Sequence, residues 1–139
     1  MKELAIEAKT ENLEAVLEFV SAELELAKCS MKLQTQIAIA VEEIFVNIAH
    51  YAYGSESGGA VVRVAAVGDE LVIEFEDSGK PYDPLNKADP DVTAGVEERE
   101  IGGLGIFMVK KIMDTVEYGY KDGKNILKIT KSFYPGVAV

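Results

Sequence analysis

The sequence predicts an α+β protein, a two-layer sandwich in which three helices cover one face of a mostly antiparallel mixed sheet. Two observations support this class. Apolar residues recur with helical spacing in three segments, and they follow the period of a strand in five shorter segments bounded by turn-forming residues. The length of 139 residues suits one domain over residues 1–139. Hydrophobic residues make up 48% of the chain and charged residues 27%, a composition typical of folded globular proteins.

The N-terminal part is expected to contain one strand and two helices. Leu4, Ile6 and Ala8 alternate with their neighbours and predict a short first strand. Residues 10–28 and 31–52 carry apolar side chains at the spacing of amphipathic helices, and turn-forming residues at 54–59 end the second one. Cys29 lies beside Ala27 and Met31 and is expected to be a small packed residue.

The rest of the chain is expected to form two hairpins separated by a loop and a helix. The hairpins turn at Gly68-Asp69 and Asp122-Gly123, and their strands cover about 60–67 with 71–77 and about 115–121 with 125–133. The segment from Pro84 to Ile101 lacks sustained periodicity, and loops of this length inside a small domain are usually functional or mobile. A third helix is expected from Gly102-Gly103 to about Asp114.

Charge and composition restrict the classes of partner. The chain has 24 acidic and 14 basic residues and a net charge of −10, which disfavours nucleic acid and anionic membranes and favours a basic protein partner. No apolar run approaches the roughly 20 residues of a membrane span, and the N-terminus lacks a signal peptide's apolar stretch, so a cytoplasmic protein is expected. With one histidine and one cysteine, the chain has neither a His–Cys zinc cluster nor an internal disulfide.

A first polar motif lies on the second predicted helix. Glu43 and Asn47 are four residues apart and share a face, with His50 close to the same strip and the apolar stripe to one side. The simplest interpretation is a solvated polar edge. The functional interpretation is a carboxylate that accepts a proton, one turn from an amide oxygen that coordinates a hard cation.

A second motif lies where a predicted strand ends and the chain turns. Leu71, Ile73 and Phe75 share one face, and the period of two places Asp77 on the same core-facing side. A buried carboxylate is costly unless it is hydrogen-bonded, so Asp77 either caps the following turn or receives a ligand amine. In the second case, Gly79 leaves room for a flat group.

A third motif opens the third predicted helix with Gly102, Gly103, Leu104 and Gly105. Free backbone N–H groups and the helix dipole favour an anion such as phosphate at this position. No Gly-Lys-Ser/Thr follows and no parallel β-α-β unit surrounds the glycines, so the segment is neither a P-loop nor a dinucleotide fingerprint. Tight packing of the loop against the helix is the alternative interpretation.

In this order, the three motifs resemble those of the GHKL ATPase superfamily, whose nucleotide site is called the Bergerat or histidine-kinase-like ATPase fold. The amino-acid sequences of these motifs are most similar to those of bacterial anti-sigma-factor serine kinases. The segments that carry this resemblance are VEEIFVN at 41–47, DSGKPYDP at 77–84 and EREIGGLGI at 98–106. The resemblance extends over essentially the whole chain.

The resemblance implies how the site handles phosphate. Asn47 would hold Mg²⁺ against the triphosphate of ATP, and Glu43 would be the base that activates the attacking hydroxyl. Backbone N–H groups of Gly103, Leu104 and Gly105 would face phosphate. Residues 84–101 would form the ATP lid, in which Arg99, and more weakly Lys87, would reach a phosphate among several acidic neighbours. His50 would belong either to the site wall or to the exposed surface.

The resemblance also implies an adenine subsite, with one departure from the family pattern. Asp77 would accept a hydrogen bond from the adenine amine, with Gly79 leaving room for the ring. Many relatives place a threonine early on the last strand, where it helps the aspartate through water. Here the matching position is Asn125, in phase with Leu127, whereas Thr130 is out of phase and should face the other way.

The leading hypothesis is therefore an ATP- and Mg²⁺-dependent serine/threonine kinase that binds a sigma factor and phosphorylates an antagonist protein. The alternative is a non-catalytic module of the same fold, in which ATP gates protein binding. The ATP-binding half of a two-component histidine kinase is a third hypothesis, disfavoured because no upstream hairpin with a phosphoacceptor histidine is present. A homodimer is expected from the resemblance.

Overall fold

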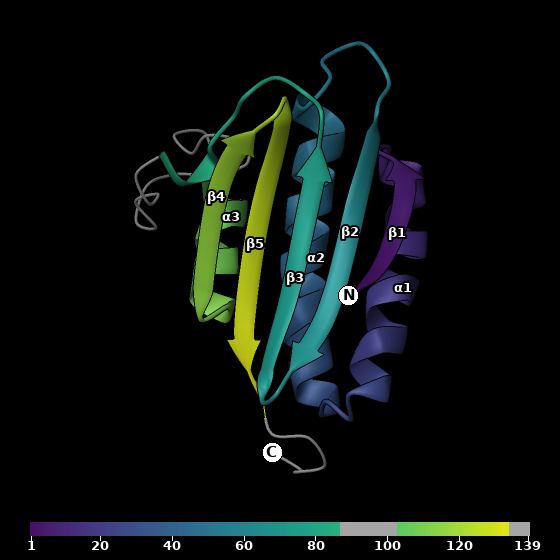
Figure 1. The fold of residues 1–139 in the computed structure, drawn as a ribbon, viewed down its shortest axis with the longest axis vertical. Helices are drawn as coiled ribbons and strands as arrows, with labels where there is room; N and C mark the ends of the chain where they lie inside the picture. Colours follow the sequence, from purple (N-terminus) through teal and green to yellow (C-terminus); the bar gives the residue numbers. More distant parts are fainter. Residues whose placement is uncertain (87–102, 134–139) are drawn as a thin grey trace.

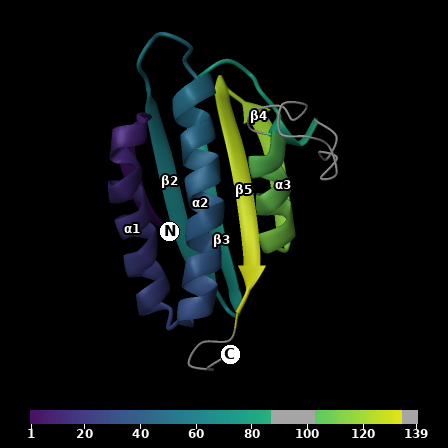
Figure 2. The same ribbon diagram turned by 180° about the vertical axis from the view of Figure 1, so that it is seen from behind.

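A five-stranded sheet with helices on one face forms the protein in a computed structural model. The structure describes residues 1–86 and 103–133. The strand order is β1-β2-β3-β5-β4, and all four described pairings are antiparallel. The strands are β1 (Lys2–Glu7), β2 (Gly59–Val67), β3 (Glu70–Asp77), β4 (Thr115–Lys121) and β5 (Lys124–Ser132). Helices α1 (Leu13–Leu26), α2 (Met31–Tyr51) and α3 (Gly103–Ile112) lie behind the sheet in Figure 1 and in front of it in Figure 2. The predicted two-layer α+β class is confirmed.

The first two helices have boundaries that local hydrogen bonds explain. Residues 10–12 form a separate 3₁₀ turn, so α1 begins at Leu13 and not at Thr10 as predicted. The helix ends early because Lys28 adopts a left-handed backbone with φ of 62°. Its N–H donates to the carbonyl of Glu25, and the Cys29 N–H donates to that of Leu24, both at 3.0 Å, which is a Schellman ending. Ser30 then caps α2 by accepting from the Leu33 N–H at 3.2 Å.

A two-residue turn joins the two strands of each hairpin at the predicted position. Val67 pairs with Glu70 across Gly68, whose φ is 63°. Lys121 pairs with Lys124, and the intervening Asp122 and Gly123 have φ values of 54° and 77°. Positive φ at both central residues, as at Asp122 and Gly123, is the geometry of a type I′ turn, which matches the twist of the flanking strands.

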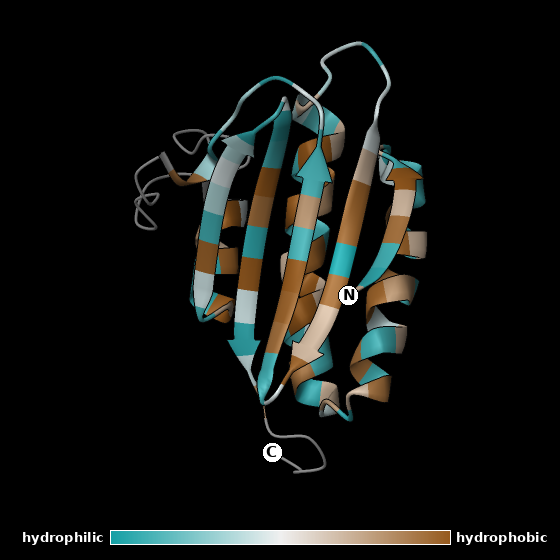
Figure 3. Cartoon of the chain, in the orientation of Figure 1, coloured by the Kyte–Doolittle hydropathy of each residue, from teal (hydrophilic) through white to brown (hydrophobic). Residues whose placement is uncertain are grey.

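The hydrophobic core lies between the sheet and the helices. Figure 3 shows hydrophobic residues, in brown, along the strands and helices of both layers. Helix α2 contributes its buried stripe to this core, and β3 contributes Leu71, Ile73 and Phe75. Cys29 is 8% exposed and belongs to the same cluster, as predicted. The C-terminal ends of α2 and β3 lie at the same end of the molecule (Figure 1), and polar side chains of both elements line one cavity there. No helix in the described part of the chain is both long and apolar enough to span a membrane.

Candidate functional site

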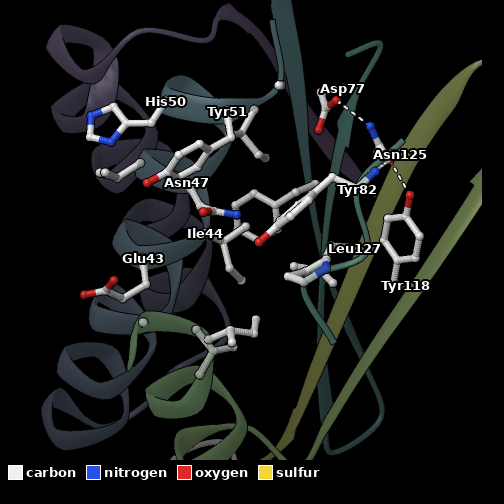
Figure 4. Close-up of a pocket in the computed structure, with 18 of the residues that line it drawn as sticks. Glu43, Ile44, Asn47, His50, Tyr51, Asp77, Tyr82, Tyr118, Asn125 and Leu127 are labelled. Atoms are coloured by element: carbon white, nitrogen blue, oxygen red, sulfur yellow. Dashed lines mark hydrogen bonds between the residues drawn. The ribbon is translucent and has the colours of Figure 1, made fainter. Parts of the chain in front are cut away.

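A cavity of about 220 Å³ opens where α2, the sheet and α3 meet (Figure 4). Apolar side chains form much of its wall, namely Ile44, Ile48, Phe75, Ile106, Val109 and Leu127. The polar residues Glu43, Asn47, Asp77 and Asn125 also line it. A mostly apolar cavity with a few convergent polar groups is the usual form of a small-molecule site.

Asp77 occupies the end of β3 and is 7% exposed. Its Oδ1 accepts hydrogen bonds from the Gly79 N–H and from Nδ2 of Asn125, both at 2.9 Å. Among the described residues, no hydrogen bond ends on Oδ2. Burial of an acceptor without a protein donor is costly, so this oxygen suits a ligand that donates a hydrogen bond. Asp77 is therefore both the turn cap and the candidate ligand acceptor, two interpretations that the sequence left open.

The absence of a side chain at Gly79 has a structural explanation that differs from the predicted one. A Cβ at this position would lie 2.1 Å from the carbonyl oxygen of Ala52 and 2.6 Å from its carbonyl carbon. The following residue, Lys80, donates its N–H to the same carbonyl at 3.0 Å. The missing side chain therefore allows the loop to pack on the end of α2, and Gly79 is not among the residues that line the cavity.

Glu43 and Asn47 lie one turn apart on α2, as predicted, and both line the cavity. Both side chains are half-buried. A Cβ on Gly105 would be only 2.5 Å from Oε2 of Glu43, so the absence of a side chain there lets the carboxylate approach the first turn of α3.

The predicted glycine-rich helix start is present in the structure. Helix α3 begins at Gly103, so Gly103, Leu104 and Gly105 all belong to its first turn. Backbone N–H groups in the first turn of a helix lack intrahelical acceptors, and the helix dipole makes this end attractive to anions. A carboxylate able to take a proton thus adjoins a turn able to bind an anion.

The donor set suits an ion that arrives with its own ligands. The described residues contain no group of three or more His, Cys, Asp or Glu side chains placed to hold a metal. Mg²⁺ is commonly bound through one or two protein groups, with waters and substrate phosphates completing the shell. The amide oxygen of Asn47, with Glu43 one turn away, fits that mode of binding.

His50 and the predicted lid contribute less to the described geometry. The His50 ring is exposed and meets Tyr51 edge to face, with 6.0 Å between the ring centroids. It lines the cavity, on the far side from Asp77 in Figure 4. Arg99, Lys87 and most of the predicted lid at 84–101 lie outside the described residues.

Sequence reasoning missed three tyrosines that line the cavity: Tyr51, Tyr82 and Tyr118. The Tyr118 hydroxyl donates a hydrogen bond to Oδ1 of Asn125, which also accepts one from the Tyr82 N–H at 3.2 Å. The alternation along β4 could have placed Tyr118 on the helix-facing side, since it pairs with Leu127. Thr130 faces away from this network and bonds to the hydroxyl of Thr115, as its phase predicted.

Comparisons with known protein sequences give consistent results. The sequence profile of the histidine kinase-like ATPase domain matches residues 6–131. The serine-protein kinase RsbW of Listeria monocytogenes serovar 1/2a is 30% identical over 96 residues, covering 66% of this chain and 61% of that protein. The serine/threonine-protein kinase BtrW of Bordetella bronchiseptica is 23% identical over 107 residues, covering 76% of this chain and 75% of that protein. The matched region therefore spans about three-fifths of the length of the Listeria relative.

Two solved structures share the fold. The RsbU and RsbW domains of a Mycobacterium tuberculosis protein superpose with a TM-score of 0.64 and 13% identity, covering 100% of this chain and 35% of that one. The Acinetobacter baumannii histidine kinase AdeS gives a TM-score of 0.54 and 14% identity, covering 96% of this chain and 68% of that one. At these identities the superpositions establish the architecture alone.

Proposed function

This chain belongs to the histidine kinase-like ATPase domain family, and on that premise we propose that it is an ATP-dependent serine/threonine protein kinase acting as an anti-sigma factor. Its protein substrate would be an antagonist of that factor. The observation that carries the proposal is that one cavity has both a hydrogen-bond acceptor, Asp77, and a base, Glu43, which lies beside the start of α3. The names of the Listeria and Bordetella relatives, both protein kinases, support it.

The Asp77 end of the cavity would hold the adenine ring. Its apolar walls, including Phe75 and Leu127, offer a surface for a flat aromatic group. Oδ2 of Asp77 would accept a hydrogen bond from the 6-amino group, because Oδ1 already has two protein donors. Hydrogen bonds to a charged acceptor are stronger than neutral ones, which makes this contact suited to base selection.

The Glu43 end would hold the triphosphate. First-turn N–H groups of Gly103, Leu104 and Gly105 would donate to phosphate oxygens, and Asn47 would hold Mg²⁺ through its amide oxygen. An ion held there by Asn47 would supply positive charge that offsets the charge of the triphosphate. Arg99 of the lid is proposed as a further phosphate contact. His50 is proposed as a residue of the site wall.

Transfer would need little covalent chemistry from the protein. The Glu43 carboxylate would accept the proton from a serine or threonine hydroxyl of the antagonist, whose oxygen forms a bond to the γ-phosphorus. The bond between that phosphorus and the bridging oxygen of ADP breaks, so the products are phosphoprotein and ADP. The positive end of α3 beside Glu43 would stabilise the negative charge on the transferring group.

We also propose the setting in which this reaction occurs. The net charge of −10 favours a basic protein face over nucleic acid or an anionic membrane, which fits a sigma factor as partner. A cytoplasmic location follows from such a partner. A homodimer is proposed from the likeness to the anti-sigma kinases.

The proposal is tested by Glu43→Gln, with Glu42→Gln as the matched control. Glu42 is the exposed neighbour of Glu43 on α2 and does not line the cavity. Each variant is incubated with Mg-ATP and the purified antagonist protein of the same organism. Phosphoserine or phosphothreonine on the antagonist is then measured by mass spectrometry, alongside the ATP dissociation constant.

Loss of transfer by roughly a hundredfold or more in Glu43→Gln, with ATP affinity nearly unchanged, is the expected result, since general bases contribute on this order. Glu42→Gln should behave as the unmodified protein. If the unmodified protein binds ATP and its antagonist but transfers no phosphate, the alternative of an ATP-gated binding module replaces the kinase. If Glu43→Gln loses ATP binding as well, Glu43 has a structural role.

A further inference from the structure

We propose that Asn125 and Tyr118 are positioning residues that set the base selectivity of Asp77 without touching the nucleotide. The inference rests on the proposed function, because it concerns the adenine end of that site. It revises the expectation that Asn125 contacts the nucleotide. The residues involved come from β3, β4, β5 and the loop after β3, and they lie together at one end of the cavity (Figure 4).

Asn125 has no hydrogen-bonding capacity left for a ligand. A primary amide offers two donor hydrogens and two acceptor lone pairs. Nδ2 donates to Oδ1 of Asp77 and to the carbonyl of Lys80, both at 2.9 Å, and makes a longer contact of 3.4 Å with the Gly79 carbonyl. Oδ1 accepts from the Tyr82 N–H at 3.2 Å and from the Tyr118 hydroxyl. All four positions are therefore filled by protein groups around a side chain that is only 7% exposed.

The same four bonds fix which way the amide faces. A flipped amide would direct its oxygen at the Asp77 carboxylate and the Lys80 carbonyl, and its NH₂ group at two other donors. Burial raises the pKa of the Tyr118 phenol, so this hydroxyl stays protonated and remains a donor near neutral pH. Tyr118 is the side chain that completes the set, and it reaches Asn125 from the neighbouring strand β4.

The fixed amide determines what Asp77 presents to the cavity. Because Asn125 and the Gly79 N–H both donate to Oδ1, the carboxylate is held with Oδ2 as its remaining acceptor. An acceptor without an attached hydrogen attracts an amino group and repels a carbonyl oxygen. A purine with a 6-amino group is therefore selected over one with a 6-oxo group, and the selection depends on how firmly the carboxylate is held.

Tyr118→Phe tests the role of the hydroxyl, and Tyr120→Phe is its matched control. Both substitutions remove one hydroxyl from the same strand. Tyr120 pairs with Asn125 in the sheet register but is 47% exposed and takes no part in the four bonds. Asn125→Asp is the second variant, since it keeps the shape of the side chain and replaces the two amide donors by at most the one proton that two adjacent carboxylates share.

The readout is a ratio of affinities, which a purely structural role would leave unchanged. Dissociation constants are measured by calorimetry for ATP and for purine riboside triphosphate, which lacks the 6-amino group. The unmodified protein should prefer ATP by roughly tenfold or more, the range for a hydrogen bond to a charged group. Tyr118→Phe should reduce this preference by roughly two- to tenfold, Asn125→Asp should reduce it at least as much, and Tyr120→Phe should leave it intact.

Two results would overturn the inference and one would point elsewhere. An unchanged ratio in Tyr118→Phe and Asn125→Asp, with only a lower melting temperature, would make both residues structural. An equal loss in Tyr120→Phe would show that the effect is not specific to the network. If the unmodified protein binds neither nucleotide, the proposed function itself fails, and this result is distinct from an altered ratio.

Discussion

Replacing Gly79 by alanine is expected to destabilise the folded protein even when no nucleotide is present. The added Cβ would lie 2.1 Å from the Ala52 carbonyl oxygen, 2.6 Å from its carbonyl carbon and 2.7 Å from the Ala52 Cβ. Two of these three nearest atoms belong to the backbone at the end of α2, so the contact is not relieved by a rotamer change. The loop has to move away from the helix instead.

That movement has an estimable cost. Overpacking of a tight contact costs about 1–3 kcal/mol. The loop would also lose the bond from the Lys80 N–H to the Ala52 carbonyl, at 3.0 Å, which contributes about 1 kcal/mol. The free energy of unfolding should therefore fall by about 2–4 kcal/mol, a large part of the stability of an ordinary domain.

Chemical denaturation of the nucleotide-free protein is the assay, with Gly119→Ala as the matched control. A Cβ on Gly119, in the edge strand β4, would meet no atom within 4 Å, and its φ is not positive. Gly119→Ala should therefore leave the stability unchanged or raise it slightly. If Gly79→Ala is as stable as Gly119→Ala and loses only nucleotide binding, Gly79 serves to admit a base and the packing argument is wrong.

Two further predictions concern Asn47 and Asp114. Asn47→Ala should remove most of the gain in ATP affinity that Mg²⁺ provides, measured by calorimetry with Mg²⁺ and with EDTA, whereas Gln36→Ala on the same helix should retain it. The Ser132 N–H, 2.7 Å from Oδ2 of Asp114, lowers the pKa of this carboxyl below its ordinary value of 3.8, with Lys131 adding to the effect. The folded state then binds fewer protons than the unfolded state, so Asp114 contributes stability above pH 3.8 that is lost as the pH falls through the lowered folded pKa. Asp114→Asn should therefore flatten the loss of unfolding free energy in denaturation curves between about pH 5 and about pH 3, and an unchanged pH profile would contradict this.

Periodicity was sufficient to predict the parts of the site that depend on one element. The period of two along β3 predicted that Asp77 faces the core, and the structure confirms its burial. Helical spacing likewise predicted that Glu43 and Asn47 share a face. These predictions succeeded because a regular backbone fixes the direction of each side chain within its own element.

Periodicity within one helix or strand could not predict the contacts between different elements. The bond from Tyr118 to Asn125 crosses from one strand to the next on a diagonal, so it depends on register and on ring orientation as well as on alternation. The approach of Gly79 to Ala52 joins a loop to the end of a helix 27 positions earlier in the chain. The end of α1 was not predicted either, because the residue with the left-handed backbone there is Lys28 and not the usual glycine.

The central claim, that this cavity binds ATP through Asp77, is tested most directly by thermal shift with ATP, ADP and GTP, with and without Mg²⁺. The comparison is between the unmodified protein and Asp77→Asn, which removes the charge of the buried acceptor while keeping its size. At one hundred times the dissociation constant, a ligand stabilises the fold by roughly 2.7 kcal/mol, which raises the melting temperature by several degrees. The expected result is an adenine-selective shift that Mg²⁺ strengthens and Asp77→Asn abolishes. An equal shift in both proteins, or none with any nucleotide, would contradict it.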